Sequence, residues 1–241
     1  MLIIGDSVTF GAMVATERAF PHQLQQFMDC SKSWRVLNGG VTGYDSAQEA
    51  EWLELFGWQL APDVVGVAFC RNDIYPSVRS QSIRPEPAGD VGRWVTEHCI
   101  LASYLQRGVW YVSAKLGLAS AAIKEAPQDP GADVPRPGWH NVDRAYRQIA
   151  EQARKRHVPV VLFIFPTLGY IEGSEPDDLT ERLFALGAEL EWTVIDLKPA
   201  LAAGPRSWFL PGDPTHPNAL GYRQAAAYAA RHLHAFGSLP K

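Results

Sequence analysis

Five short apolar segments run through the sequence, and each has the length of a single β-strand. Residues 63–69 are apolar almost throughout, which is typical of a parallel strand that is covered on both faces. Residues 2–4 form the shortest segment, which stops at Gly-Asp-Ser near the start of the chain. The other predicted strands are residues 34–37, 158–165 and 192–196. The sequence therefore predicts a five-stranded sheet.

Between these segments, apolar residues recur at the spacing of amphipathic helices. Residues 20–28 and 46–60 are predicted helices, and two further helices precede the fourth strand and close the chain. Strands that alternate with helices imply right-handed crossovers, so we predict an α/β fold, a three-layer α/β/α sandwich around five parallel strands. The predicted inward-facing residues are Phe20, Leu24, Phe27, Met28, Val142, Tyr146, Ile149, Ala153, Tyr222, Ala226, Ala229 and Leu233.

One connection is much longer than the others. About sixty residues separate Asn72 from the helix before the fourth strand, where a few residues are usual. We therefore expect a single domain, residues 1–241, with a helical insertion after the third strand at about residues 76–139. The insertion could form a cap whose aromatic residues line an acyl or aryl pocket, although simple packing onto the sandwich explains most of them. These residues are Trp94, Tyr104, Trp110, Tyr111 and Trp139.

The charge of the chain is nearly balanced, with 22 basic and 26 acidic residues and a net charge of -4. This balance argues against nucleic acid or an anionic membrane as the main partner and favours a small-molecule substrate. Three widely spaced cysteines, Cys30, Cys70 and Cys99, argue against a disulfide framework and against a zinc cluster. We therefore expect no metal and no cofactor, and the sequence predicts no particular oligomeric state.

No segment of the sequence has the length and apolar character of a membrane span, and no signal peptide precedes the first strand. A cytoplasmic location is the default expectation. The first strand begins so early, however, that an upstream segment could precede it.

Ser7 lies where the first predicted strand turns into a helix. Ligands collect at such points in open α/β sheets, and the unpaired N–H groups and dipole of a helix N-terminus favour negative charge. A serine oxygen there could attack a carbonyl carbon while these groups stabilise the oxyanion. Because Gly-Asp-Ser is a common tripeptide, a serine cap or turn is the alternative interpretation.

Asp213 and His216 share a short, proline-rich loop before the last predicted helix. A carboxylate three residues from an imidazole can fix its tautomer and stabilise the imidazolium that forms during catalysis. Alternatively, Asp213 caps a turn and His216 begins the helix. A serine, a histidine and a carboxylate at loop ends of one sheet favour the functional interpretation.

Four segments together resemble the SGNH, or GDSL, hydrolase family. They are residues 5–7, the glycine-rich loop 38–43, Asn72-Asp73 and residues 213–217. The resemblance implies a flavodoxin-like sandwich and a serine esterase, lipase or acylhydrolase that works through an acyl-enzyme.

By the same resemblance, Ser7 is the nucleophile, His216 the general base and Asp213 its orienting partner. The implied oxyanion hole consists of the Ser7 and Gly43 backbone N–H groups and the Asn72 side chain. One departure is that Cys70 stands where the family has glycine in Gly-x-Asn-Asp, and Arg71 precedes Asn72. Arg71 could itself approach the oxyanion or hold an anionic group of the substrate.

Several other functions remain open on the sequence alone. The glycine-rich loop lacks the lysine and the spacing of a phosphate-binding loop, and no Gly-x-Ser-x-Gly of an α/β-hydrolase occurs. An O-acyltransferase or a carbohydrate acetylesterase would use the same site, with a different acceptor or substrate. A non-catalytic binding module is the remaining alternative.

Overall fold

A computed structural model of the chain describes residues 1–28, 34–74, 138–175, 178–204 and 206–235. Its strands form one parallel sheet in the order β2-β1-β3-β4-β5, which confirms the predicted five-stranded sheet and its flavodoxin-like arrangement. The strands are β1 (Leu2–Gly5), β2 (Leu37–Gly40), β3 (Val65–Phe69), β4 (Val160–Ile164) and β5 (Thr193–Asp196). The strand order reverses between β1 and β3, and ligands bind in such sheets outside the carboxyl ends of the strands at this point.

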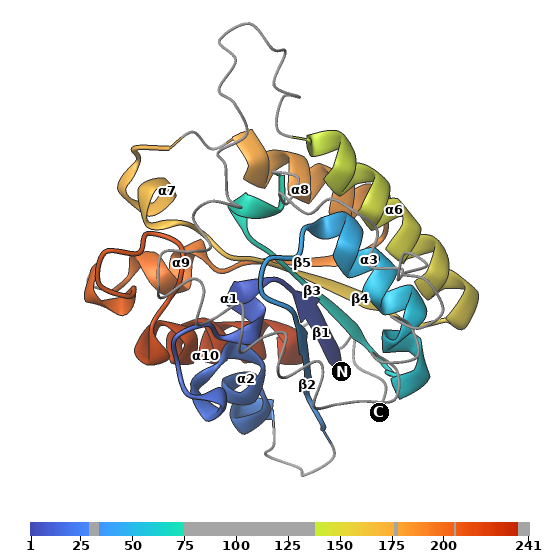
Figure 1. Ribbon diagram of the computed structural model, residues 1–241, viewed down its shortest axis with the longest axis horizontal. Helices are drawn as coiled ribbons and strands as arrows, with labels where there is room; N and C mark the ends of the chain where they lie inside the picture. The colour runs from blue at the N-terminus through green and yellow to red at the C-terminus, as the bar shows by residue number, and fades with distance from the viewer. Residues whose placement is uncertain (29–33, 75–137, 176–177, 205, 236–241) are drawn as a thin grey trace, which may run out of the picture. The chain divides into compact units, whose positions relative to one another are not determined.

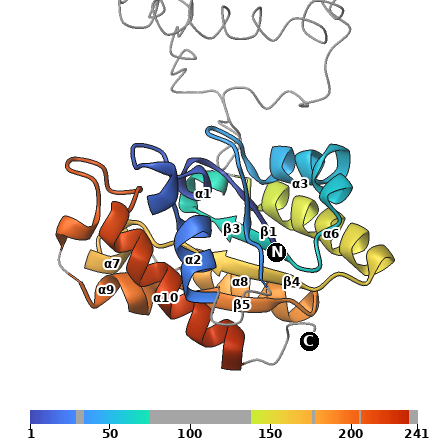
Figure 2. The same cartoon turned by 90° about the horizontal axis from the view of Figure 1, so that it is seen from below.

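Helices cover both faces of the sheet, which confirms the three-layer sandwich (Figure 1, Figure 2). Side chains alternate along β1, so Ile3 faces one layer of helices while Leu2 and Ile4 face the other. The first layer contains α2 (Phe20–Met28), α9 (Lys198–Ala202) and α10 (Ala219–Ala235). The second contains α3 (Ser46–Leu55), α6 (Trp139–Arg156) and α8 (Asp178–Glu189).

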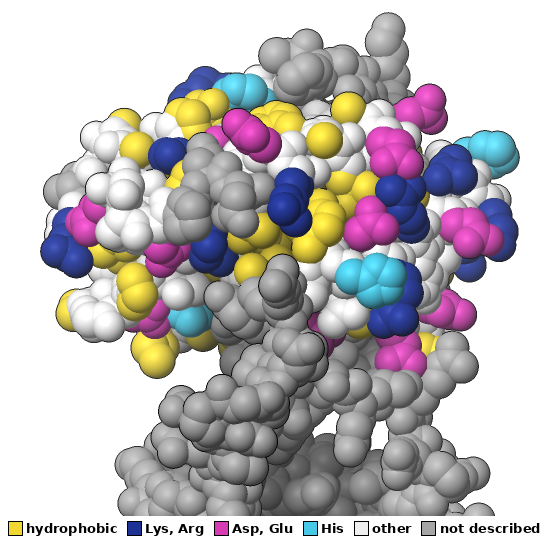
Figure 3. All heavy atoms as spheres, turned by 90° about the horizontal axis from the view of Figure 1, so that it is seen from above, with side chains coloured by type: hydrophobic (Ala, Val, Ile, Leu, Met, Phe, Trp, Pro, Cys, Tyr) yellow, Lys and Arg dark blue, Asp and Glu magenta, His cyan; other side chains and the backbone are white. Residues whose placement is uncertain are grey.

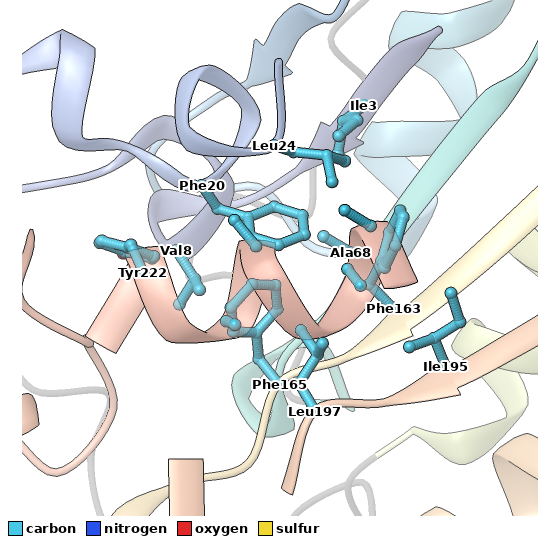
Figure 4. Close-up of a cluster of buried hydrophobic side chains, with 14 of the residues drawn as sticks. Ile3, Val8, Phe20, Leu24, Ala68, Phe163, Phe165, Ile195, Leu197 and Tyr222 are labelled. Atoms are coloured by element: carbon cyan, nitrogen blue, oxygen red, sulfur yellow. The ribbon is translucent and has the colours of Figure 1, made fainter. Parts of the chain in front are cut away.

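The core of the first layer is built around Phe20 (Figure 4). Its ring meets the rings of Phe163 and Phe165 edge to face, with centroids 5.3 and 5.0 Å apart. Aromatic pairs prefer this geometry because the positive edge of one ring meets the negative face of the other. Tyr222 of α10 also contacts Phe165, so the last helix is fixed against the end of β4. All four rings are buried.

The outer face of the second layer is charged. Arg147 of α6 bonds to Asp143 one turn earlier and to Glu189 of α8, and Lys155 pairs with Glu151. Basic and acidic side chains are also interspersed on the face of the described residues that Figure 3 shows. Such a mixture suits a surface that faces water.

Several boundaries differ from those predicted. The second strand is β2, not residues 34–37, because glycines that resemble a loop belong to the strand. A Cβ at Gly40 would lie 2.8 Å from the Thr9 Cβ, so only glycine fits at this position, and one at Gly39 would lie 3.0 Å from the Ile3 carbonyl oxygen, so any other residue there would be crowded. The second predicted helix ends at Leu55 and continues as a 3-10 turn, η3 (Gly57–Leu60).

Among the residues that the structure describes, the helices α7 (Leu168–Glu172), α8 and α9 were not predicted. The sequence carries a signal for α8, because Leu179, Leu183, Leu186 and Leu190 follow helical spacing and are all buried.

The insertion expected at residues 76–139 lies outside the described residues as far as residue 137. Trp139 begins α6 and packs, partly buried, against the core of the second layer. None of the described helices is both long enough and apolar enough to cross a membrane.

Candidate active site

Ser7 is the first residue of α1 (Ser7–Phe10), a single helical turn directly after β1. The side chain of Asp6 caps this turn by accepting a hydrogen bond of 2.8 Å from the Val8 N–H. Gly11 ends the turn in the left-handed conformation, with φ 81°. The sequence therefore places the Ser7 hydroxyl at the carboxyl edge of the sheet, at the reversal of strand order.

The structure brings Ser7 together with His216, although 209 residues separate them in the sequence. The Ser7 Oγ lies 2.8 Å from the His216 Nε2. On the opposite side of the ring, the His216 Nδ1 lies 2.7 Å from the Asp213 Oδ2. Asp213 and His216 are both mostly buried, with side-chain exposures of 24% and 19%. The three side chains form a continuous hydrogen-bonded chain.

The loop that carries Asp213 and His216 is held by its own backbone. The Asp213 Oδ1 accepts hydrogen bonds from the N–H groups of Thr215 and His216, at 2.8 and 3.1 Å. The Leu210 N–H donates to the His216 carbonyl, and Asn218 caps the start of α10. Asp213 therefore does cap a turn, as the simpler interpretation expected, and its second oxygen still reaches the imidazole.

The environment of Asp213 favours its charged form. Partial burial on its own would raise the pKa of this carboxyl, but the Thr215 and His216 N–H groups and the His216 ring hold the pKa below its ordinary value. An ionised carboxylate only accepts hydrogen bonds, so the His216 Nδ1 must donate the proton. The Nε2 is then the acceptor that faces the Ser7 hydroxyl.

Asn72 lies in η4 (Arg71–Ile74), a 3-10 turn that directly follows β3. Its Nδ2 donates a 2.6 Å hydrogen bond to the Asp6 Oδ2. The same oxygen lies 3.2 Å from the Ser7 Oγ, farther than the His216 nitrogen that also faces this hydroxyl. An amide nitrogen has two N–H donors, so Asn72 keeps a second donor that the bond to Asp6 does not use. Asp6, which lies between Asn72 and Ser7, was not among the predicted site residues.

Gly43 lies in the loop between β2 and α3, and its φ of 82° is in the region that favours glycine. Within the part of the chain that the structure describes, the backbone N–H groups of Ser7 and Gly43 have no hydrogen-bond acceptor. The strand β2, which precedes this loop, is tied to α1 by Asn38, whose Nδ2 donates to the Phe10 carbonyl and whose Oδ1 accepts from the Gly40 N–H. Neither N–H group is therefore used by the described part of the fold.

Arg71 is held by a neighbouring carboxylate. Its Nε lies 3.5 Å from the Glu175 Oε2, which also accepts a 2.6 Å hydrogen bond from the Thr167 hydroxyl. Leu168, the next residue, donates its N–H to the Pro214 carbonyl, so these contacts join η4 to the loop that carries His216. Arg71 also lines a small pocket with the apolar residues Phe69, Ile164, Phe165 and Leu179.

Cys70, which replaces the family's glycine, is fully buried in the core of the first layer. Burial and the nearby carboxylates Asp6 and Asp73 raise the pKa of this thiol well above its ordinary value, so it stays protonated. Among the residues that the structure describes, no three His, Cys, Asp or Glu side chains are placed to hold a metal ion.

The fold and this arrangement define an α/β/α sandwich in which hydrogen bonds join a serine, a histidine and an aspartate, in that order, at the carboxyl edge of the sheet. Residues 3–224 match the model of the GDSL-like Lipase/Acylhydrolase family. The chain therefore belongs to this family of esterase- and acylhydrolase-type hydrolases, as the sequence motifs indicated. A search of curated protein sequences returned no match.

Solved structures with the same fold share little sequence with this chain. A G-D-S-L family protein from Desulfitobacterium hafniense DCB-2 is 17% identical, with a TM-score of 0.59 over 95% of this chain and 97% of the other. A lipase/acylhydrolase from Enterococcus faecalis is 16% identical, with a TM-score of 0.56 over 99% and 96%. An acetyl xylan esterase, AlAXEase, is 15% identical, with a TM-score of 0.59 over 97% and 100%.

Proposed function

We propose that this protein is a serine hydrolase that cleaves carboxylic esters through an acyl-enzyme on Ser7. The observation that carries the proposal is the chain of two hydrogen bonds, Ser7 Oγ to His216 Nε2 and His216 Nδ1 to Asp213 Oδ2. Weak nucleophiles such as a serine hydroxyl need an adjacent base that a third group orients. These three residues supply those parts at the edge where such sheets bind ligands.

In the first half of the reaction, the Ser7 Oγ attacks the ester carbonyl carbon. The Oγ–C bond forms, the hydroxyl proton passes to the His216 Nε2, and the carbonyl electron pair moves to oxygen. Asp213 stabilises the imidazolium without taking its proton. The tetrahedral intermediate then collapses, the bond to the alcohol oxygen breaks, and His216 returns the proton to the leaving alcohol.

The oxyanion of this intermediate is assigned three donors: the Ser7 N–H, the Gly43 N–H and the Asn72 amide. The support is that both backbone groups lack acceptors among the described residues and that Asn72 is anchored to Asp6 through one of its two donors. Donors that are fixed before the reaction stabilise developing charge without reorganising.

In the second half of the reaction, water attacks the acyl carbon and gives a proton to the His216 Nε2. The bond between this carbon and the Ser7 Oγ then breaks, His216 returns the proton to Ser7, and the carboxylic acid leaves. An alcohol in place of water would make the protein an O-acyltransferase on the same site. Two structural neighbours are described as an acetyl xylan esterase and an acetyl-xylooligosaccharide esterase, so acetylated sugars belong among the first substrates to test.

The test is a panel of p-nitrophenyl esters of increasing acyl length, thioesters and acetylated xylo-oligosaccharides, with the Ser7→Ala variant as the blank. We expect turnover of at least one ester by the wild type and almost none by folded Ser7→Ala. A fluorophosphonate should label the wild type at Ser7 only. Wild-type turnover by folded Ser7→Ala would disprove the mechanism, and a wild type that neither hydrolyses nor reacts with the phosphonate would favour a binding module.

A further inference from the structure

Behind Asn72, two carboxyl groups lie in the interior of the protein. Glu49 of α3 and Asp73 of η4 are each only 1% exposed, and we call them the buried acidic pair. The Tyr146 side chain of α6 is fully buried beside them, and Ser46 of α3 lies beside Tyr146. Side chains from three separate elements therefore converge at this point between the sheet and the second layer of helices.

Most polar atoms of this group have no hydrogen-bond partner among the described residues. They include both carboxylate oxygens of Glu49 and the Asp73 Oδ1. An ionised carboxylate costs several kcal/mol to bury when nothing compensates its charge. The pair therefore needs a proton or a cation, and the described side chains are not arranged to hold a metal ion.

The charged groups that act on the pair make two ionised carboxylates still less favourable. Asp6 on the β1 side and Asp45 at the start of α3 are both acidic, and the other titratable neighbours are the Cys70 thiol and the Tyr146 hydroxyl. Burial raises the pKa of Glu49 and of Asp73 well above the ordinary values, and the neighbouring carboxylates raise both further. The pair therefore keeps a proton that an exposed carboxyl would lose.

The proton is best placed on Glu49. The Asp73 Oδ2 accepts a 2.8 Å hydrogen bond from the Cys70 N–H, which favours the charged form of Asp73, whereas both oxygens of Glu49 lack a donor. A protonated Glu49 is a hydrogen-bond donor, and the unpaired Asp73 Oδ1 is an acceptor.

Asp73 also controls the turn that carries Asn72. Its carboxylate accepts from the Cys70 N–H, and its own N–H donates a 2.9 Å hydrogen bond to the Cys70 carbonyl. These two bonds close the turn behind Asn72, while the Asp6 carboxylate holds the amide in front. A displacement of Asp73 would therefore move the amide of Asn72.

We propose that Glu49 stays protonated and shares its proton with Asp73, and that this proton-sharing pair positions Asn72 for the oxyanion. Glu49 and Asp73 are thus positioning residues, and neither touches the substrate. The role in catalysis rests on the proposed function, because it requires Asn72 to be an oxyanion donor. Removing the proton at high pH places a second negative charge beside Asp73, so kcat should fall as the pH rises while KM for a neutral ester changes little.

The proton itself is tested without any activity measurement. Difference infrared spectra of the wild type minus Glu49→Gln at neutral pH should contain the carbonyl stretch of a protonated carboxylic acid. The matched control is Glu54→Gln, which removes an exposed carboxyl from the same helix and should leave that band in place. Absence of the band from folded wild type would overturn the proposal even if the protein is an active esterase.

Kinetics on one neutral ester test the positioning role. Glu49→Gln keeps the shape and the neutral state, so it should retain kcat near neutral pH and lose the alkaline fall in kcat that the wild type and Glu54→Gln show. Asp73→Asn should lower kcat about tenfold or more with little change in KM. Unchanged kcat in Asp73→Asn, or an alkaline fall that persists in Glu49→Gln, would overturn the positioning role. A wild type that cleaves no ester but has the infrared band would disprove the proposed function and leave the protonated Glu49 established.

Discussion

Asn72 lies between two groups of carboxyl side chains that differ in how many hydrogen bonds they accept. In front of it, Asp6 and Asp213 accept hydrogen bonds on both of their oxygens, and the pKa of Asp213 is lowered. Behind it, Glu49 has no hydrogen-bond partner among the described residues, and burial raises the pKa of both members of the buried acidic pair. Asp213 is 24% exposed whereas the pair is only 1% exposed, and more donors face Asp213 than Glu49, so burial and hydrogen-bond donors act in the same direction at both places.

The difference suits the two roles that we propose. The carboxylate beside His216 must stay ionised in order to orient the ring and stabilise an imidazolium. A pair behind the oxyanion hole should add as little negative charge as possible, since its charge would oppose the oxyanion. Substitutions that remove one of these charges, or one of the hydrogen-bond donors between the two groups, test the comparison.

The largest effect is expected for Asp213→Asn. The amide can still accept from the Thr215 and His216 N–H groups, but its NH₂ group would donate to the His216 Nδ1 and move the ring proton to the Nε2. The ring could then no longer accept the Ser7 proton, so kcat should fall by about 10⁴-fold. Steady-state kinetics against Asp196→Asn, which removes a capping carboxylate at the start of α9, check this. Full activity in Asp213→Asn would make Asp213 only a turn residue.

The second effect concerns Asn72→Ala, which removes one donor from the proposed oxyanion hole. Loss of one such donor costs about 2.7 to 4 kcal/mol, or roughly a hundred- to thousandfold in kcat. KM should change far less, because the donation matters most in the tetrahedral intermediate.

Arg71→Ala is the matched comparison for Asn72→Ala. Arg71 lines the small pocket and pairs with Glu175. If it contacts the substrate without touching the oxyanion, its removal should mainly change KM. A large loss of kcat confined to Arg71→Ala would instead assign the oxyanion contact to the guanidinium.

A smaller effect is expected for Asp6→Asn. The side chain of Asp6 accepts from the Val8 N–H and the Asn72 amide, and its Oδ2 also lies 3.2 Å from the Ser7 Oγ. An asparagine has one acceptor oxygen where aspartate has two. Its NH₂ group would therefore face either the Asn72 amide or the Val8 N–H, donor against donor. Leaving a buried donor unpaired costs about 1 to 3 kcal/mol, so we expect a loss of kcat of about ten- to a hundredfold.

A double-mutant cycle with Asn72→Ala isolates this contact. If Asp6 acts by holding Asn72, Asp6→Asn should have much less effect in the Asn72→Ala background than in the wild type. Fully additive losses would show that Asp6 acts elsewhere, for example through the cap of α1.

The order of elements was predictable from the sequence because parallel strands are buried on both faces and so appear as apolar runs. The second strand was misplaced because Gly39 and Gly40 resemble a loop, although the strand requires them for its close approach to β1 and α1. The short helices α7 and α9 lack a full helical period, so the apolar pattern does not reveal them.

The motifs also led to the residues that the structure brings together at Ser7. The buried acidic pair was not predicted, because Glu49 looks like any polar residue of an amphipathic helix. Its register does carry a signal, since Ser46, Glu49, Ala50 and Leu53 lie at helical spacing and all four are buried. A spacing pattern cannot reveal that Asp6 reaches Asn72, because 66 residues separate them and only the parallel pairing of β1 with β3 brings them together.

The smallest expected effect is on the free energy of unfolding, and its measurement needs no substrate. The pKa of Asp213 is lowered from 3.8 in the folded chain, so Asp213 stabilises the fold above that pH and the contribution disappears as the pH falls. The pKa of Glu49 is raised from 4.5, so the folded chain retains a proton that the unfolded chain releases, and stability falls as the pH rises above 4.5. The slope from one such proton is at most about 1.4 kcal/mol per pH unit. In urea unfolding across pH, Asp213→Asn should therefore flatten only the acid side of the stability curve, and Glu49→Gln only the neutral and alkaline side. If the free energy of unfolding changed with pH equally in the wild type and in Glu49→Gln above pH 4.5, Glu49 would be ionised in the folded protein.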